Sequence, residues 1–131
     1  MTLLLDTHVL IWWMEKNPRL GPGTRKTLLS SSTQPVVSAV SIWEISIKAG
    51  IGRLEMADEP ETWVPRLQAE WGVRSLPITF EHAGAVRRLP MHHNDPFDRM
   101  LVAQAQCEDL TIVTVDSAIA AYAVRTIDAR T

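Results

Sequence analysis

The chain has 131 residues, 46% of them hydrophobic and 21% charged, which suits a single globular domain spanning residues 1–131 around one core. Its formal net charge is −2, so no overall positive field marks it as a nucleic-acid binder, and local basic patches would have to provide such contacts. A single cysteine, Cys107, excludes an internal disulfide and a zinc site built from paired cysteines.

The first predicted element is a strand in the stretch "TLLLD", residues 2–6, which ends on an acid. No basic residue precedes its leucines, as one would in a secretory signal, and the longest apolar run, residues 9–14, is too short to cross a bilayer. We therefore expect a cytoplasmic protein with no membrane partner.

Further short apolar runs, partly β-branched, alternate with stretches of helical spacing. The other strands are predicted within residues 35–40, 73–78, 111–116 and 124–129, and helices within residues 9–16, 24–31, 42–48, 80–89 and 97–108, with one more helix ending at Trp71. The stretches "AGIG" and "WGV" offer glycines that can close the third and fourth helices. This alternation favours an α/β fold, a parallel sheet with helices on both faces.

Four acids fall where such a sheet builds its binding sites, at the carboxyl ends of strands and near the starts of helices. Asp6 ends "LLLD" and Asp116 ends "IVTVD", while Glu44 is predicted in or near the first turn of the helix after "PVVSAV". Asp98 is predicted in the first turn of the helix in "NDPFDRMLVAQA". We expect all four carboxylates to face one cleft.

Each acid also has a purely structural explanation. Asp6 and Asp116 suit the N-caps of the following helices, and Asp98 complements the free N–H groups of a first turn. Glu44 could complete a capping box with Ser41 or pair with a lysine one turn on. Taken one at a time, these explanations are sufficient, so the case for chemistry depends on all four acids meeting at one place.

Four like charges in one cleft repel and raise one another's pKa values unless a cation lies among them. An all-oxygen cluster, in a chain without paired cysteines, suits Mg²⁺, with Mn²⁺ as the alternative, better than zinc. Such ions promote phosphodiester cleavage by lowering the pKa of water and stabilising the charge that builds on phosphorus. The predicted metal-binding and catalytic residues are Asp6, Glu44, Asp98 and Asp116.

Neighbouring residues have secondary roles to which the sequence offers alternatives. Thr114 could hydrogen-bond a ligand carboxylate or simply form strand, and Asp95 could be an outer acid or only an N-cap. Arg99 could neutralise the cluster, reach a phosphate or be solvated. His93 is interpreted as an ordinary loop histidine, and Trp43 as a core residue. Basic residues that could contact phosphates or form solvated helix faces are Arg19, Arg25, Lys26, Lys48, Arg53, Arg87 and Arg88.

The stretches "LLLDTHVLIWW", "SAVSIWEISIK", "HNDPFDRMLVAQA" and "LTIVTVD" resemble PIN domains, specifically the VapC-type ribonuclease toxins of type II toxin–antitoxin modules. The similarity covers nearly the whole chain, with the four stretches in the family's order and spacing. It implies a three-layer α/β/α sandwich with a central parallel sheet and Mg²⁺-dependent endoribonuclease activity. The family's four acidic positions correspond to Asp6, Glu44, Asp98 and Asp116. The resemblance also implies a homodimer and a cognate antitoxin whose tail occupies the active-site groove.

Two other functions remain open at this point. Phosphatases with an aspartate nucleophile also place an acid at the end of the first strand, but they need a second acid two residues on, where this chain has His8. A non-catalytic PIN module that binds RNA or a partner could afford to lose an acid, yet none of the four is missing. The sequence does not name the RNA that would be cleaved.

Overall fold

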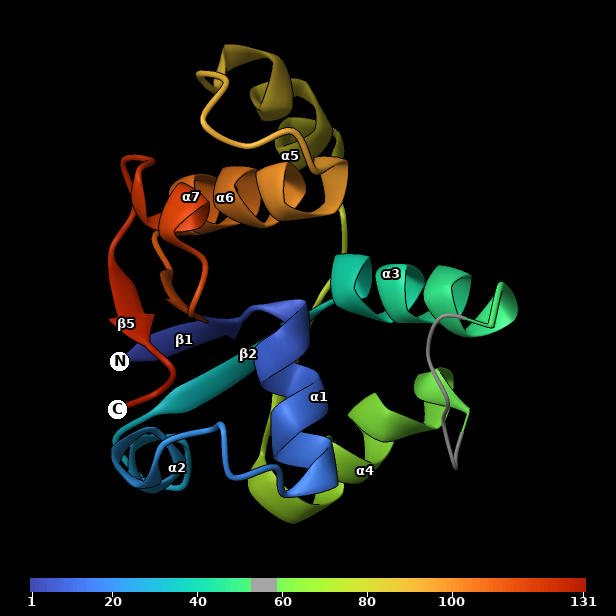
Figure 1. Cartoon of the computed structure of the whole chain (residues 1–131), viewed down its shortest axis with the longest axis vertical. Coiled ribbons are helices and arrows are strands. Elements are labelled where there is room, and N and C mark those ends of the chain that lie inside the picture. The colour runs from blue at the N-terminus through green and yellow to red at the C-terminus, as the bar shows by residue number, and fades with distance from the viewer. Residues whose placement is uncertain (53–58) are drawn as a thin grey trace.

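The computed structural model describes residues 1–52 and 59–131, and its central element is a five-stranded sheet in which all neighbouring strands are parallel (Figure 1). The strands are β1 (Thr2–Leu5), β2 (Gln34–Ser38), β3 (Arg74–Leu76), β4 (Thr111–Thr114) and β5 (Thr126–Asp128). Their order across the sheet is β3-β2-β1-β4-β5. Each strand falls on one of the five predicted runs, which confirms the parallel α/β fold.

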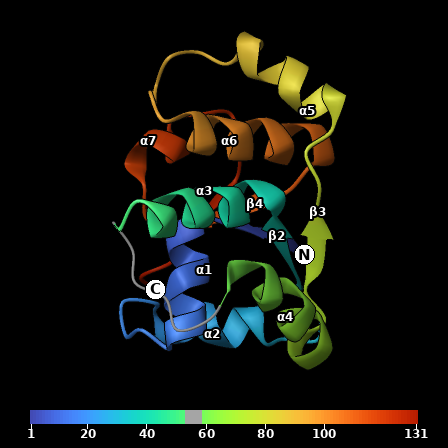
Figure 2. The same cartoon turned by 90° about the vertical axis from the view of Figure 1, so that its right-hand side faces the viewer.

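Helices form a layer on each side of this sheet. They are α1 (Thr7–Glu15), α2 (Pro22–Leu28), α3 (Ala39–Gly50), α4 (Trp63–Trp71), α5 (Phe80–Ala85), α6 (Pro96–Glu108) and α7 (Ser117–Ala120). Figures 1 and 2 show α1, α2 and α4 on one face, α5, α6 and α7 on the other, and α3 projecting from the edge between α1 and α6. The three-layer sandwich is therefore confirmed. No helix in the described ranges has the length and hydropathy needed to span a bilayer.

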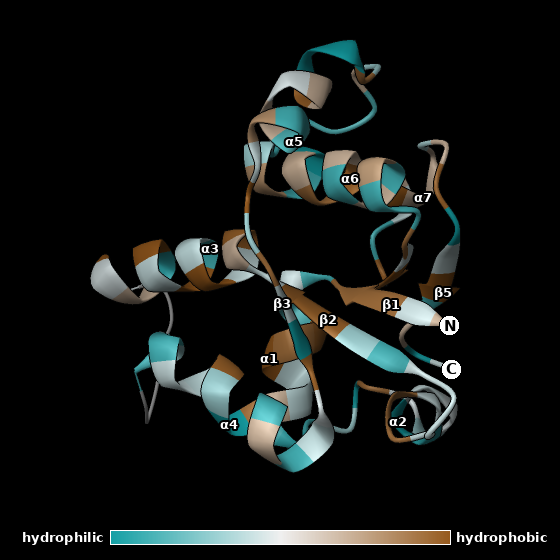
Figure 3. Cartoon of the chain, turned by 180° about the vertical axis from the view of Figure 1, so that it is seen from behind, coloured by the Kyte–Doolittle hydropathy of each residue, from teal (hydrophilic) through white to brown (hydrophobic). Residues whose placement is uncertain are grey.

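The leucines of β1 show how the sheet is buried on both faces. Leu3 and Leu5 belong to the same core cluster as Leu10 of α1, whereas Leu4 belongs to a second core cluster with Leu101 of α6. Successive side chains of a strand point to opposite faces, so a strand covered on both sides needs apolar residues at every position. All three leucines are at most 1% exposed, and β1 is largely brown in Figure 3.

The structure moves some predicted helix boundaries. Ala39 and Val40, predicted as the end of a strand, are the first residues of α3, because the hydroxyl of Ser38 caps that helix by accepting the Val40 N–H at 3.0 Å. Glu44 consequently lies in the second turn of α3 and not in the first. The short helix α7 was expected only through the capping explanation of Asp116, and the 3-10 turn Pro60–Thr62 was not predicted, because a single turn is too short to show a hydrophobic period.

The direction of chain progression changes at β1. From β1 the chain moves outward through β2 to β3, and it then returns to place β4 and β5 on the other side of β1. Loops that leave adjacent strands in opposite directions open a crevice at the carboxyl edge of a parallel sheet. Asp6 directly follows β1, and Asp116 lies just beyond the end of β4. The topology therefore brings these two acids to the crevice.

Candidate metal centre

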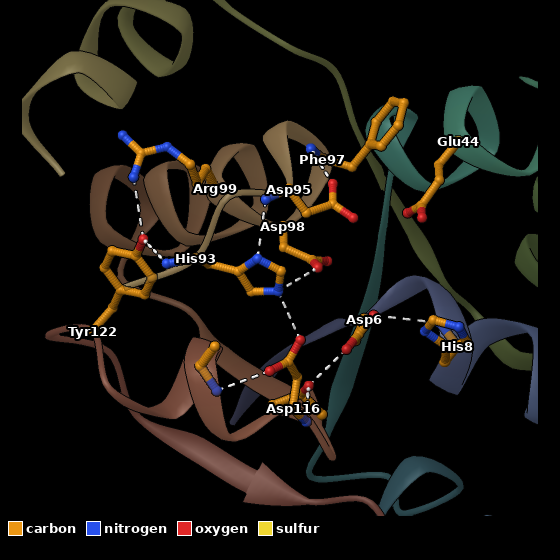
Figure 4. Close-up of polar contacts among 12 residues, drawn as sticks. Asp6, His8, Glu44, His93, Asp95, Phe97, Asp98, Arg99, Asp116 and Tyr122 are labelled. Atoms are coloured by element: carbon orange, nitrogen blue, oxygen red, sulfur yellow. Dashed lines mark hydrogen bonds and ion pairs between the residues drawn. The ribbon is translucent and has the colours of Figure 1, made fainter. Parts of the chain in front are cut away.

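Four predicted acids meet at this carboxyl edge, each from a different part of the fold. Asp6 precedes α1, Glu44 lies on α3, Asp98 lies in the first turn of α6, and Asp116 precedes α7. Figure 4 shows the four carboxylates pointing toward a common space. Their charges also act on one another, because the charges of Asp6 and Glu44 both contribute to the pKa of Asp98. The structure therefore brings together four acids that are spread along the sequence from Asp6 to Asp116.

Asp6 and Asp116 combine helix capping with a place in the cluster. One oxygen of Asp6, Oδ1, accepts the His8 N–H at 3.3 Å, while its Oδ2 accepts the Thr114 hydroxyl at 2.6 Å. In Asp116, Oδ1 accepts an N–H from the first turn of α7 at 2.8 Å, and Oδ2 lies 2.8 Å from His93 Nε2. The capping explanation and the chemical explanation are thus compatible, because the cap orients a carboxylate whose other oxygen faces the cluster.

Thr114 links the same two acids. Its hydroxyl donates to Asp6 Oδ2 and accepts the backbone N–H of Asp116 at 3.0 Å, and the side chain is 3% exposed. A buried hydroxyl with both a donor and an acceptor contact has a fixed orientation. Thr114 therefore holds the carboxylate of Asp6 against the start of the loop that carries Asp116.

Glu44 is the most deeply buried member of α3 that carries charge, at 2% exposed. Its Oε2 lies 2.5 Å from Lys48 Nζ, whereas Oε1 has no hydrogen-bond partner among the described residues. Burying a carboxylate oxygen without a partner is costly, so such an atom indicates a missing ligand. The capping-box explanation of Glu44 is wrong, because Ser41 is buried and accepts the Thr7 hydroxyl at 3.0 Å, which ties α3 to α1.

The cluster carries more negative charge than its neighbours neutralise. Burial raises the pKa of Asp6 above its usual value, despite the hydrogen bond from Thr114. Burial, together with the charges of Asp6 and Asp95, raises the pKa of Asp98 to about 7. In the described ranges, Lys48 is the one lysine or arginine in ion-pair contact with the four acids. The residues present therefore fit a divalent cation held by oxygen atoms.

His93 is the site residue that the sequence analysis missed. Its Nε2 lies 2.9 Å from Asp98 Oδ2 and 2.8 Å from Asp116 Oδ2, and its Nδ1 accepts the Asp95 N–H at 3.0 Å. Potential ligand atoms of His93, Asp98 and Asp116 lie within 4.8 Å of one another. The sequence signal was the position of "HH" in the loop just before α6, two residues from the N-cap Asp95, and that position does not say which histidine turns toward the acids.

His93 and the acids change one another's affinity for protons. Burial lowers the pKa of His93, but the hydrogen bond with Asp116 and the charge of Asp98 outweigh burial, so its pKa is raised. Burial raises the pKa of Asp116, but the hydrogen bond from His93 and the capping N–H outweigh it, so that pKa is lowered. Near pH 7, Asp98 is therefore only partly protonated, whereas Asp116 is charged.

Arg99 does not neutralise the cluster, and that prediction is wrong. Its guanidinium donates to the carbonyls of Val86, Leu89 and Pro90 and to the hydroxyl of Tyr122, at 2.9 to 3.4 Å. The carbonyl of Val86 already accepts the Leu89 N–H of the 3-10 turn and has a second lone pair for Arg99, and a guanidinium with five N–H donors can reach this carbonyl and those of Leu89 and Pro90 together. Arg99 consequently fastens the loop before α6 to the rest of the fold.

Asp95 caps α6, as expected, by accepting the Phe97 N–H at 2.8 Å, and a role as an outer acid stays a prediction. Trp43 is not a core residue, since it is 56% exposed and meets Phe97 edge to face with ring centroids 5.1 Å apart. The buried side of α3 carries Val40 and Ile45, so Trp43 faces away from the core. Arg53, one of the basic candidates, lies outside the described residues.

Comparisons with known proteins agree with this fold. The family model described as PIN domain matches residues 3–125. Ribonuclease VapC22 of Mycobacterium tuberculosis is 30% identical over 116 residues, which are 88% of this chain and 87% of that protein. The chain belongs to the PIN-domain family. Its resemblance to VapC-type members, first seen in four short stretches, is confirmed by this relative.

Solved structures show the same fold. One is the structure of VapBC2 from Rickettsia felis bound to a DNA fragment from the VapBC2 promoter. A chain of that structure matches with a TM-score of 0.71 at 13% identity, over 97% of this chain and 98% of that chain. A chain of VapBC-1 from nontypeable Haemophilus influenzae gives a TM-score of 0.64 at 18% identity, covering 100% of both. At these identities the likeness concerns the fold alone.

Proposed function

We propose that the protein is a VapC-type endoribonuclease that hydrolyses RNA phosphodiester bonds with a divalent cation, Mg²⁺ or Mn²⁺, held by Asp6, Glu44, Asp98 and Asp116. The observation that carries this proposal is the convergence of four acids from four elements around a buried Glu44 oxygen that has no partner. A bound divalent cation supplies Lewis-acid stabilisation of charge on the phosphate and lowers the pKa of an attacking water. A relative named as a ribonuclease supports RNA as the substrate.

The protein's own contribution is to hold the carboxylates in place before the ion arrives. Thr114 and the N–H of His8 fix the two oxygens of Asp6, and Lys48 fixes one oxygen of Glu44. Preorganised ligands lose little conformational freedom on binding, which favours a defined geometry. Asp98 is the acid that releases a proton when the ion binds near neutral pH, because its pKa is raised to about 7.

A groove beside the acids supports a single-stranded RNA substrate. It has a volume of about 410 Å³ and is lined by Thr7, His8, Ile11, Trp12, Glu15, Asn17, Arg19 and Lys48. His8 lies two residues after Asp6 and Lys48 contacts Glu44, so the groove begins at the acids. Arg19 is exposed and can meet a phosphate, while the half-buried ring of Trp12 offers a face on which a base can stack.

Replacing Arg19 by Glu should weaken RNA binding roughly tenfold at low salt and reduce its salt dependence, because one phosphate contact is lost and a repulsive charge replaces it. The affinity for Mg²⁺ should stay unchanged. Fluorescence anisotropy with a labelled RNA in the presence of EDTA measures binding without cleavage. The matched control is Arg125→Glu, at an exposed arginine paired with Asp109 away from the groove. Equal losses in both variants would mean that the groove is not the RNA path.

The experiment that tests the proposed function is incubation of the purified, partner-free protein with transfer, ribosomal and messenger RNA. Cleavage is expected with Mg²⁺ or Mn²⁺ and should stop with EDTA. The variant Glu44→Gln, prepared in parallel, excludes a contaminating nuclease if it is inactive. Binding without cleavage of any of these RNAs would favour the non-catalytic alternative, and cleavage that persists in EDTA would contradict the metal mechanism.

The proposal extends to an antitoxin partner and the toxin role in a toxin–antitoxin module, with a homodimer and a cytoplasmic location as predicted. Solved relatives named as VapBC complexes support the partner. Trp43 and Ile47 of α3 and its C-cap residue Ile51 are spaced four residues apart and are 56%, 40% and 61% exposed. An exposed apolar stripe of this kind, close to the acids, is typical of a surface that a protein partner covers.

A further inference from the structure

We propose that His93 is a positioning residue that holds Asp98 and Asp116 together through its Nε2–H, and that it is not a ligand of the ion. This inference rests on the proposed metal function of the two acids. Two roles of His93 have to be distinguished, because potential ligand atoms of His93, Asp98 and Asp116 lie close together. Such a group is usually interpreted as a metal site in which the histidine is itself a ligand.

The hydrogen bonds of the ring decide between these two roles. Nδ1 of His93 accepts the backbone N–H of Asp95 at 3.0 Å, and a backbone amide can act only as a donor. The lone pair of Nδ1 is therefore occupied, and in the neutral ring the proton must lie on Nε2. Nε2 lies 2.8 Å from Asp116 Oδ2 in hydrogen-bond geometry, so its proton points at Asp116, and Asp98 Oδ2 lies beside it at an ion-pair distance of 2.9 Å.

A metal ligand must offer a lone pair, and neither nitrogen of His93 has one free in this arrangement. Coordination through Nε2 would require loss of its proton and of both carboxylate contacts. Mg²⁺ also prefers oxygen to imidazole nitrogen. The acids, in contrast, keep capacity for the ion, because each carboxylate oxygen has a second lone pair.

The backbone of His93 is held as firmly as its ring. Its N–H donates to the hydroxyl of Tyr122 at 3.0 Å, and the same hydroxyl accepts Arg99 Nη1 at 3.1 Å. Tyr122 is 4% exposed, and Arg99 is anchored on carbonyls of the preceding turn and loop. Arg99 and Tyr122 thus form a support that fixes the loop, and Figure 4 shows His93 lying between this support and the acids.

The consequence concerns how the site is assembled. Asp98 belongs to α6 and Asp116 to the loop between β4 and α7, so nothing in the local chain keeps their like charges together. The imidazole Nε2–H, which donates to Asp116 and lies within ion-pair distance of Asp98, opposes the repulsion of the two carboxylates before an ion binds. Partners that orient metal ligands in this way typically change metal affinity by roughly 10-fold to 100-fold when they are removed.

Nitrogen NMR of the protein with ¹⁵N-labelled histidine tests the protonation of the ring directly. In the metal-free protein above pH 8, His93 should show the tautomer with the proton on Nε2, and that proton should remain at saturating Mg²⁺. A His93 ring with the proton on Nδ1, or one that loses its Nε2 proton as Mg²⁺ binds, would overturn the proposal. This readout does not depend on RNA cleavage.

Variants test the positioning role by the same Mg²⁺ titration, followed by amide NMR. His93→Ala should weaken Mg²⁺ binding roughly 10-fold or more. His93→Gln, whose side-chain amide can place an N–H near the position of Nε2, should recover most of the affinity. Asp109→Asn, which changes an exposed carboxyl at the other end of α6, should bind Mg²⁺ like the wild type. Wild-type affinity in His93→Ala would refute the inference, whereas absence of Mg²⁺ binding in the wild type would refute the proposed function instead.

Discussion

Replacing Asp98 by Asn should lower RNA cleavage at least about 100-fold while leaving the fold intact, because even partners that only orient metal ligands contribute up to this factor. Asn keeps the shape of the side chain and an oxygen that can accept from His93 Nε2, so the contacts of the first turn of α6 are retained. The substitution removes the negative charge with which Asp98 would bind the ion. The same charge destabilises the metal-free protein, since burial and neighbouring acids raise the pKa of Asp98.

The same variant should therefore be more stable than the wild type without metal at pH 8, with a melting temperature higher by roughly 2–5 °C. Addition of Mg²⁺ should narrow this difference, because the ion stabilises the wild type more than the variant. The matched control is Asp109→Asn at the other end of α6, where the residue has a φ of 55° that Asn tolerates well. Full cleavage by Asp98→Asn would exclude a role for this acid in the chemistry.

Thermal stability should depend strongly on pH in the absence of divalent ions, falling by several degrees between pH 5 and pH 8. Asp98 has an ordinary pKa of 3.8 that the fold raises to about 7, and the pKa of Asp6 is also raised, mainly by burial. The folded state thus binds more protons than the unfolded state between these values, and stability falls as pH rises through this window. The raised pKa of His93 acts in the same direction above pH 6.5.

Asp116 contributes with the opposite sign, because its pKa is lowered in the folded protein. Its stabilising effect is complete above its ordinary pKa and is lost as pH falls below about 4, so the metal-free protein should be most stable near pH 4–5. Differential scanning fluorimetry in EDTA measures this profile, and 5–10 mM Mg²⁺ should flatten its alkaline side. A melting temperature that rises steadily from pH 5 to pH 8 in EDTA would contradict the raised pKa values of Asp98 and Asp6.

The sheet could be predicted from sequence because a parallel strand buried on both faces leaves a simple pattern. Leu3, Leu4 and Leu5 are apolar at consecutive positions, and the neighbouring strands β2 and β4 each contain a consecutive apolar pair, Val36–Val37 and Ile112–Val113. The acids could be placed for a related reason, since Asp6 and Asp116 mark the ends of such runs, and the carboxyl ends of parallel strands meet at one edge. The order of the elements therefore carries much of the information about the site.

The remaining errors concern orientations that only tertiary contacts decide. His93 turns toward the acids because Tyr122, which is 29 residues away, holds its backbone, and no local pattern encodes that contact. Arg99 follows Asp98 in sequence, but successive residues on a helix point in different directions, and the carbonyls that bind Arg99 lie in the preceding segment. Trp43 is exposed because α3 projects from the edge of the sheet, which its composition does not reveal.

The most direct test of the metal centre is a crystal structure of the partner-free protein grown or soaked with Mn²⁺, recorded to give the anomalous signal of manganese. The proposed site predicts an anomalous peak among the carboxylates of Asp6, Glu44, Asp98 and Asp116, with Glu44 Oε1 in reach of the ion. A fully soaked crystal with no peak at this position, or with manganese bound only elsewhere, would contradict the claim that these four acids form a metal site.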